Sequence, residues 1–495
     1  MRALEARLAR ASTIVLLLVL LVLLAACALP AAKSGSPAPA RPSSSVVPEV
    51  PQDPDDTGYD KALSEPVEDS YYPDSGDPGV DALHYDLDLS WAPGKRVLTG
   101  VATVIFRATS DDTSFQLALG PSLEVTDVSL DGVGVEWVHD GTDLVVEAPV
   151  VGDERYVLVV AYAGTPEPVA APTTRDDYSE SGFMITESGE TWTMQEPYGA
   201  HTWYPVNDQP SDKALYDFVL AVPSPWVGVA NGELVERAEE GPRTVTRWHL
   251  ADPAASYLTT LAFGDYTMTS NTSRSGVEID YWVPADEPEL ATGLETAANG
   301  LDWLEATLGP YPFDTLGFVL VDSQSGMETQ TMITLGKSDY TLSAPVLVHE
   351  MAHQWYGDEV TPDDWRDVWM NEGMAMYVQG MWEAERSGIS IDEQMDVYAD
   401  VEDEYRAESG PPAAYHPDAF GEGNIYYGPA LMWHELRQRI GDEEFFRIVR
   451  EWPQARAGTS TDRDDYLAWL EQETGEELTA FFDAWLLGDT TPPRD

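Results

Sequence analysis

Two histidines four residues apart are the clearest chemical signal in the sequence. His349 and His353 frame the run His-Glu-Met-Ala-His, within a stretch that is expected to be helical. Their spacing places both imidazoles on one helical face, about one turn apart, where they can bind the same Zn²⁺. Glu350, next to the first histidine, is then placed to take a proton from a metal-activated water. A catalytic zinc site also needs a third protein ligand, and the sequence offers a candidate downstream.

That candidate is Glu372. Eighteen residues lie between it and His353. Taken alone it could be a solvated carboxylate of an acidic protein. Its flanks, residues 369–375 (Trp-Met-Asn-Glu-Gly-Met-Ala), resemble the Trp-Leu-Asn-Glu-Gly-Phe-Ala run of the aminopeptidase N family of zinc metallopeptidases. Residues 353–361 (His-Gln-Trp-Tyr-Gly-Asp-Glu-Val-Thr) are similar to the same family's sequence after its zinc helix. The resemblance implies one Zn²⁺ per chain, held by His349, His353 and Glu372.

A third match concerns the amino end of a substrate. Residues 325–329 (Ser-Gly-Met-Glu-Thr) resemble the family's Gly-Ala-Met-Glu-Asn exopeptidase signature. The resemblance implies that Gly326 and Met327 align the substrate backbone and that Glu328 binds the free α-amino group. Serine replaces the first glycine of the signature and threonine replaces its asparagine, so the shape of the pocket is expected to differ.

Two further matches complete the set. The run that begins at Glu196 (Glu-Pro-Tyr-Gly-Ala, leading to Trp-Tyr-Pro-Val-Asn-Asp) is similar to the segment in which the family's β-domain offers a second carboxylate to the ammonium group. Tyr426 matches the tyrosine of the family's Tyr-Xaa-Lys/Arg-Gly helix start, which donates a hydrogen bond to the developing oxyanion. Tyr427 is the alternative at that position, and Gly428 and Pro429 replace the usual basic residue and glycine.

The resemblance predicts a zinc-dependent aminopeptidase that removes N-terminal amino acids from peptides with a free N-terminus. Glu350 would act as the general acid–base and Tyr426 would stabilise the oxyanion, while Glu196 and Glu328 would bind the substrate ammonium. Two alternatives stay open. One is a zinc endopeptidase or another hydrolase on the same metal site, and the other is a non-catalytic, peptide-binding surface lipoprotein.

Four other residues are weaker candidates. His201 and His416 could lie near the cleft, but partly buried structural roles are favoured, and His434 falls within an expected helix where packing explains it. Asp367 could orient a ligand histidine, as metal-bound imidazoles usually require, or it could be an exposed aspartate at a helix start.

The spacing of apolar residues changes along the chain, and this change predicts which strands and helices position the candidate residues. Short alternating runs with Asp-Gly turns cover residues 79–268 and predict a β-sandwich-like N-terminal domain. Helical periods dominate residues 269–495 and predict a mainly helical catalytic domain with a small sheet, which the resemblance identifies as a thermolysin-like zinc peptidase domain. The fold class is therefore α+β and multidomain. The expected helices are 289–308, 343–357, 371–386, 426–440, 443–452 and 464–487, with a buried strand at 316–321.

The first 78 residues are expected to lie outside this fold. Residues 1–27 carry arginines, an apolar run of eleven and small residues before Cys27, which resembles the lipobox of bacterial lipoproteins. An ordinary signal peptide with a bystander cysteine is the alternative. Residues 28–78 are rich in proline, serine and alanine and are expected to form a disordered tether. The chain is thus expected to be exported and anchored to a membrane by lipid at Cys27, with its catalytic domain outside the cytoplasm.

Charge and cysteine content limit the remaining possibilities. Against 27 basic residues the chain carries 87 acidic ones, a formal net charge of −60, so nucleic acid is not an expected partner. Cys27 is the single cysteine, which excludes intrachain disulfides and cysteine-based metal sites.

Overall fold

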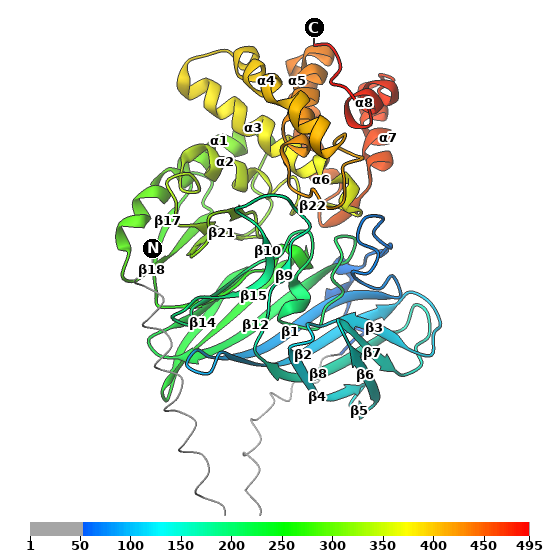
Figure 1. Ribbon diagram of the computed structural model, residues 1–495, viewed down its shortest axis with the longest axis vertical. Helices are drawn as coiled ribbons and strands as arrows, with labels where there is room; N and C mark the ends of the chain where they lie inside the picture. The colour runs from blue at the N-terminus through cyan, green and yellow to red at the C-terminus, as the bar shows by residue number, and fades with distance from the viewer. Residues whose placement is uncertain (1–52, 495) are drawn as a thin grey trace, which may run out of the picture. The chain divides into compact units, whose positions relative to one another are not determined.

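Alternating side chains account for the sheets of the N-terminal half. In β2 (Val97–Ala108) every second residue from Leu98 to Val104 is buried, as expected for a strand with one face on the core. The computed structural model, which describes residues 53–494, places β2 in an eight-stranded sheet (Figure 1). In spatial order its strands are β14 (Glu233–Glu240), β15 (Arg243–Ala255), β12 (Lys213–Pro223), β1 (Val80–Ala92), β2, β8 (Arg155–Gly164), β4 (Leu123–Leu130) and β5 (Val133–Gly134). All neighbours are antiparallel except β1 and β12.

A second sheet shares the core of the first. Its strands, in order, are β13 (Val227–Ala230), β16 (Leu261–Gly264), β11 (Thr191–Met194), β10 (Glu180–Ile185) and β9 (Val169–Ala170). Trp91 of β1 and Phe183 of β10 meet with ring centroids 5.6 Å apart inside this core. A three-stranded sheet of β3 (Phe115–Ala118), β7 (Asp143–Glu147) and β6 (Glu136–Asp140) flanks the pair. This arrangement confirms the predicted sheet-rich N-terminal domain.

The catalytic domain begins with a small sheet that places one strand at the site. Its order is β17 (Tyr266–Thr272), β18 (Glu278–Pro284), β19 (Thr315–Val321), β21 (Met332–Gly336) and β20 (Gly326–Met327). The predicted domain boundary at residue 268 falls inside β17, and the change of sheet occurs between β16 and β17. β20 is an edge strand, paired antiparallel to β21, so its outer edge faces the helices.

Eight helices complete the catalytic domain and confirm its predicted helical character (Figure 1). They are α1 (Ala297–Leu308), α2 (Ala344–Ala352), α3 (Trp369–Ser387), α4 (Ile391–Ser409), α5 (Tyr427–Ile440), α6 (Asp442–Ala455), α7 (Arg463–Thr474) and α8 (Thr479–Leu486). Their apolar faces share one core with β18 and β19, in which Trp369 of α3 and Trp433 of α5 are fully buried.

Two helical expectations were wrong. The single helix expected at 464–487 is two helices, because Gly475 adopts a left-handed conformation (φ +68°) that ends α7. Helix α4 was not expected, because its sequence is strongly acidic and its apolar stripe is thin. It nevertheless begins with a complete capping box, in which Ser390 and Glu393 bond each other's backbone amides.

The end of the expected tether is ordered and spans both domains. A 3₁₀ helix at Thr57–Ala62 contacts the β-domain, and Val67 donates its backbone N–H to the Ser211 hydroxyl. Asp69 then accepts a hydrogen bond from the backbone N–H of Trp365 in the catalytic domain, at 2.7 Å. Residues 53–78 are therefore part of the fold, because they bury polar groups that both domains satisfy.

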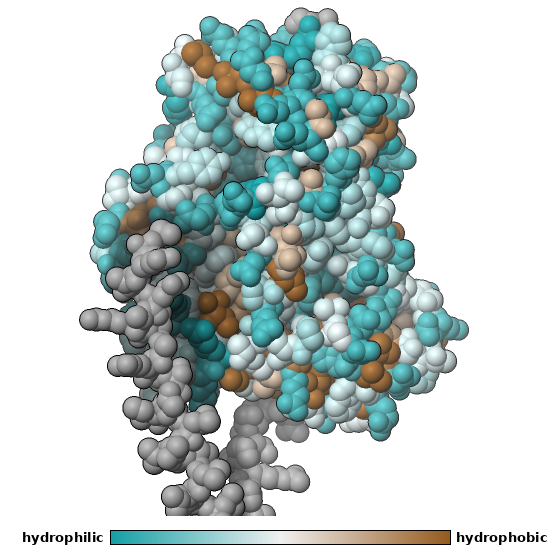
Figure 2. All heavy atoms as spheres, viewed as in Figure 1, coloured by the Kyte–Doolittle hydropathy of each residue, from teal (hydrophilic) through white to brown (hydrophobic). Residues whose placement is uncertain are grey.

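Several predictions concern residues outside those described, among them the signal peptide, Cys27 and the tether from 28 to 52. Within residues 53–494, no helix has the length and apolar character needed to cross a membrane. On the face shown in Figure 2, hydrophilic residues predominate and apolar residues are scattered among them.

Candidate active site

The three predicted zinc ligands converge between α2 and α3. His349 and His353 lie one turn apart at the end of α2, and Glu372 lies in the first turn of α3. Glu372 Oε2 is 3.2 Å from His349 Nε2 and 3.3 Å from His353 Nε2. All three side chains are buried. Helices α3 and α5 can approach closely behind the site because Gly373 has no side chain, and a Cβ there would lie 2.2 Å from Pro429.

This donor set fits a zinc ion. Two nitrogens and one carboxylate oxygen match the His₂Glu type of catalytic site, and tetrahedral ligands at 2.0–2.1 Å from zinc would be about 3.3 Å apart. His353 Nδ1 is 3.1 Å from the backbone oxygen of Tyr356, which holds the ring so that Nε2 points at the site. His349 Nδ1 has no partner among the described residues.

The electrostatics of the site also favour a bound cation. Burial opposes the charge of His353, yet the nearby carboxylates of Glu328 and Glu372 raise its pKa well above the ordinary value. Burial likewise opposes ionisation of Glu372, but His353 and His349 hold its pKa well below the ordinary value. The site therefore stabilises a positive charge next to an ionised carboxylate.

Glu350 faces the same cavity from α2 and is buried. Burial raises the pKa of Glu350 to about 8. The charge of His353 lowers this pKa, whereas the charges of Glu328 and Glu372 raise it. Gly326 of β20 makes room for it, because a Cβ at position 326 would lie 2.7 Å from Glu350 Oε1. A side chain at position 326 would displace the carboxylate, so the glycine serves the position of Glu350 as well as the backbone of β20.

Glu196 and Glu328 line the cleft from the β-domain and from the segment after β20. Glu328 is buried and Glu196 is half-buried, and each has one buried carboxylate oxygen without a hydrogen-bond partner among the described residues. Burial raises the pKa of both, and their mutual repulsion raises that of Glu196 further. Tyr178 holds the backbone of Glu196 in place, because the Tyr178 hydroxyl accepts a hydrogen bond from the Glu196 backbone N–H at 3.0 Å. Among the described residues, no salt bridge neutralises either carboxylate.

Tyr426 and Tyr427 face different neighbours. The ring of Tyr426 stacks on His349 with centroids 6.0 Å apart, and burial and the charge of Glu372 raise the pKa of its hydroxyl. Tyr427 instead contacts Tyr398 and Tyr405 of α4, with centroids 5.2 and 5.6 Å away. Tyr426 is therefore the tyrosine beside the metal ligands.

The cleft that joins these groups has a volume of about 600 Å³. Its walls include residues that the sequence did not single out, namely Arg175, Tyr178, Tyr340, Val346, Met376, Gln379, Glu383, Tyr398, Tyr405 and Glu422. Gln379 lies seven residues after Glu372 on α3, so helical periodicity could have placed it on the same face. Arg175 carries no comparable signal, because it belongs to an irregular segment between β9 and β10.

The weaker candidates lie elsewhere. His201 Nδ1 lies 2.7 Å from the buried carboxylate of Asp208, and His434 contacts Tyr377 and Asp392, so both are structural. His416 is exposed and does not line the cleft. Asp367 is neither exposed nor close to a ligand histidine. It accepts hydrogen bonds from the Trp369 indole and the Arg463 backbone.

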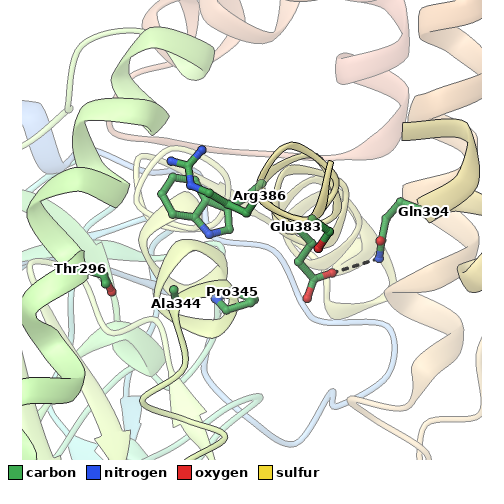
Figure 3. A pocket seen from close by; sticks show the side chains of 8 residues that line it. Thr296, Ala344, Pro345, Glu383, Arg386 and Gln394 are labelled. Atoms are coloured by element: carbon green, nitrogen blue, oxygen red, sulfur yellow. Dashed lines mark hydrogen bonds between the residues drawn. The ribbon is translucent and has the colours of Figure 1, made fainter. Parts of the chain in front are cut away.

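A second pocket lies on the outer side of α3 (Figure 3). In it, Arg386 stacks on Trp382 with the guanidinium carbon 3.8 Å from the ring centroid. Glu383 accepts a hydrogen bond from the Gln394 side chain at 3.0 Å. None of the zinc ligands lines this pocket.

Fold and site together show a β-domain followed by a helical domain with a His₂Glu donor set, and comparison with known proteins identifies the family. The Peptidase family M1 domain matches residues 292–485 and the Peptidase M1 N-terminal domain matches residues 81–258. The chain belongs to peptidase family M1, as the sequence resemblance predicted.

Individual relatives support the same assignment. The chain is 25% identical over 440 residues to aminopeptidase N of Streptomyces lividans, covering 82% of this chain and 50% of the relative. It spans about half the length of the curated relatives it matches. The M1 zinc metallopeptidase of Deinococcus radiodurans is 28% identical with a TM-score of 0.77, covering 87% of this chain and 99% of that one. A further structure of that enzyme is described as bound to a Tyr-Ser-Ala substrate, with 27% identity, a TM-score of 0.76 and the same coverage.

Proposed function

We propose that the protein is a zinc-dependent aminopeptidase that removes single amino acids from the free N-termini of peptides. The observation that carries this proposal is the pair Glu196 and Glu328 in the cleft that holds the metal ligands, each with one buried carboxylate oxygen that is unpaired among the described residues. A substrate ammonium would neutralise both, whereas an acylated N-terminus would leave them buried and unpaired. The aminopeptidase relatives support the same activity.

His349, His353 and Glu372 would hold the zinc ion, which when bound polarises a carbonyl and acidifies water. Glu350 would accept a proton from the attacking water and pass it to the leaving amine, a role worth about 10²–10⁴-fold. Tyr426 would donate a hydrogen bond to the carbonyl oxygen as negative charge develops on it.

The outer edge of β20 would align the substrate backbone. Gly326 and Met327 pair with β21 on one side only, which leaves backbone groups on the other side for an extended peptide. The ammonium bound by Glu196 and Glu328 would then fix the first peptide bond beside Glu350. This positioning would limit cleavage to one residue from the N-terminus.

The test of the function uses fluorogenic aminoacyl amides with purified zinc-loaded protein. We expect hydrolysis that a zinc chelator abolishes and that Glu350→Gln lowers by about 10²–10⁴-fold while zinc content is unchanged. Glu385→Gln is the matched control, because Glu385 lies outside the cleft and accepts a hydrogen bond from Trp303. No hydrolysis across the panel, or full activity of Glu350→Gln, would refute the proposal.

We further propose that the chain is an exported lipoprotein, anchored to a membrane through Cys27, with its catalytic domain outside the cytoplasm. The apolar run and the Leu-Ala-Ala-Cys sequence support this proposal. The test is the mass of the mature N-terminus and its partitioning into detergent. Lipid attached to Cys27, lost in Cys27→Ser, is the expected result. A soluble protein cleaved elsewhere would contradict it.

A further inference from the structure

Arg175 is the one lysine or arginine that lines the catalytic cleft in the described part of the chain. The ionisable carboxylates of the same wall are six glutamates, at positions 196, 328, 350, 372, 383 and 422. Two of these belong to the ammonium pocket and two to the metal site. Apart from the metal site, Arg175 is therefore the place along the described cleft wall where a negatively charged substrate group would be attracted, although Asp177 already pairs with it.

The guanidinium of Arg175 bridges the two walls of the cleft. Its Nη2 donates to the Ser325 hydroxyl on the β20 side, and its Nη1 donates to the Gly421 carbonyl on the side of Tyr426, both at 3.3 Å. Asp177 accepts from Nε and Nη2, at 3.1 and 2.7 Å, and fixes the orientation of the side chain. These four hydrogen bonds leave one of the five guanidinium N–H groups without a described protein acceptor.

Arg175 contacts the cleft wall at Ser325, and the sequence separation of Ser325 from Glu328 limits how far this contact lies from the ammonium pocket. Ser325 precedes Glu328 by three residues, and three extended residues span at most about 10 Å. A tripeptide whose ammonium is bound near Glu328 has its carboxylate at about the same distance, if it runs along β20 toward Ser325. Arginine recognises carboxylates through charge-assisted hydrogen bonds, and the remaining N–H of Arg175 can donate one.

We propose that Arg175 binds the C-terminal carboxylate of the substrate and so selects di- and tripeptides with a free carboxyl end. This inference rests on the proposed aminopeptidase function and names its substrate class. The cleft would then bind both ends of a short peptide. Glutamates would bind its ammonium group and one arginine would bind its carboxylate. Longer peptides would place a neutral backbone beside Arg175 and lose this interaction.

The test compares peptides that differ only in the charge of their C-terminus. Release of alanine from Ala-Ala-Ala and from its C-terminal amide is measured by mass spectrometry with zinc-loaded protein. We expect kcat/KM for the free acid to exceed that for the amide by about 10- to 100-fold, the range for hydrogen bonds to a charged group. In Arg175→Gln this ratio should fall to within about threefold of one.

Arg386→Gln is the matched control, because it removes one exposed arginine from the outer pocket of Figure 3 and should leave the ratio unchanged. Thermal unfolding and zinc content check the fold, and Arg175→Lys, which keeps the charge, should retain part of the preference. A purely structural Arg175 would lower the acid and the amide rates equally. A wild-type ratio near one, or a ratio that survives Arg175→Gln, would overturn the inference. Because aminoacyl amides carry no carboxylate, their hydrolysis tests the proposed function separately.

Discussion

Tyr426 and Tyr427 are neighbours in the sequence with different expected effects on the reaction. We predict that Tyr426→Phe lowers kcat by about 10²–10³-fold, because it removes a hydrogen-bond donor from the developing oxyanion. Tyr427→Phe should change kcat by less than about threefold, because Tyr427 packs on Tyr398 and Tyr405 instead of His349. Steady-state kinetics of both variants on one aminoacyl amide measure the difference. Equal losses in the two variants would contradict the assignment.

The site residues that could be predicted from the sequence are those whose role is recognisable from a short run of neighbouring residues. The histidine pair is fixed by one helical turn, and Glu372 and Glu328 stand within short runs of recognisable composition. Arg175 could not be predicted, because its contacts with Ser325 and Gly421 join residues 150 and 246 positions apart. Only the folded chain brings an irregular segment of the β-domain into the cleft.

At the scale of elements, the segment before β1 connects the two domains. Asp69 accepts hydrogen bonds from the backbone N–H groups of Tyr71, Tyr72 and Trp365, at 2.9, 2.7 and 2.7 Å, and is almost fully buried. We predict that Asp69→Ala lowers the free energy of unfolding by about 2–3 kcal/mol, since buried donors would be left unsatisfied. Denaturant unfolding measures the effect.

The matched control is Asp74→Ala in the same segment, because Asp74 is exposed and its loss should change stability by less than about 0.5 kcal/mol. An unchanged midpoint for Asp69→Ala would show that the segment does not stabilise the contact between domains. Equal effects of the two substitutions would contradict the specific role of the Asp69 hydrogen bonds.

Strong periodicity made most elements predictable, and weak or misleading composition explains the exceptions. The expected helix at 289–308 is a 3₁₀ segment (Pro288–Thr296) that continues into α1, and the expected strand at 316–321 is β19 with one additional residue. Residues 53–78 have the composition of a linker, yet their stability depends on partners such as Trp365, 296 residues from Asp69. Such long-range hydrogen bonds leave no local pattern to recognise.

At the scale of the whole molecule, the excess of acidic residues should oppose folding. The formal net charge of −60 implies repulsion that is relieved when the chain expands. We predict that Tm at pH 8 rises by several degrees between 0.1 and 1 M NaCl, as the Debye length falls from about 10 to about 3 Å. Calorimetry of zinc-loaded protein measures this change.

The same series at pH 5 is the control, because partial protonation of carboxylates lowers the net charge and should reduce the rise in Tm. A Tm at pH 8 that stays constant or falls with salt would show that charge repulsion does not limit stability. The fold could then owe its stability mainly to the two buried cores.

The most direct measurement of the central claim is the product pattern from one peptide with a free and with an acetylated N-terminus. Glu196 and Glu328 each have a buried carboxylate oxygen without a partner among the described residues, so only the free ammonium should be accepted. Mass spectrometry should show stepwise loss of single N-terminal residues from the free peptide and no cleavage of the acetylated one. Internal fragments, or equal cleavage of both peptides, would contradict the aminopeptidase account.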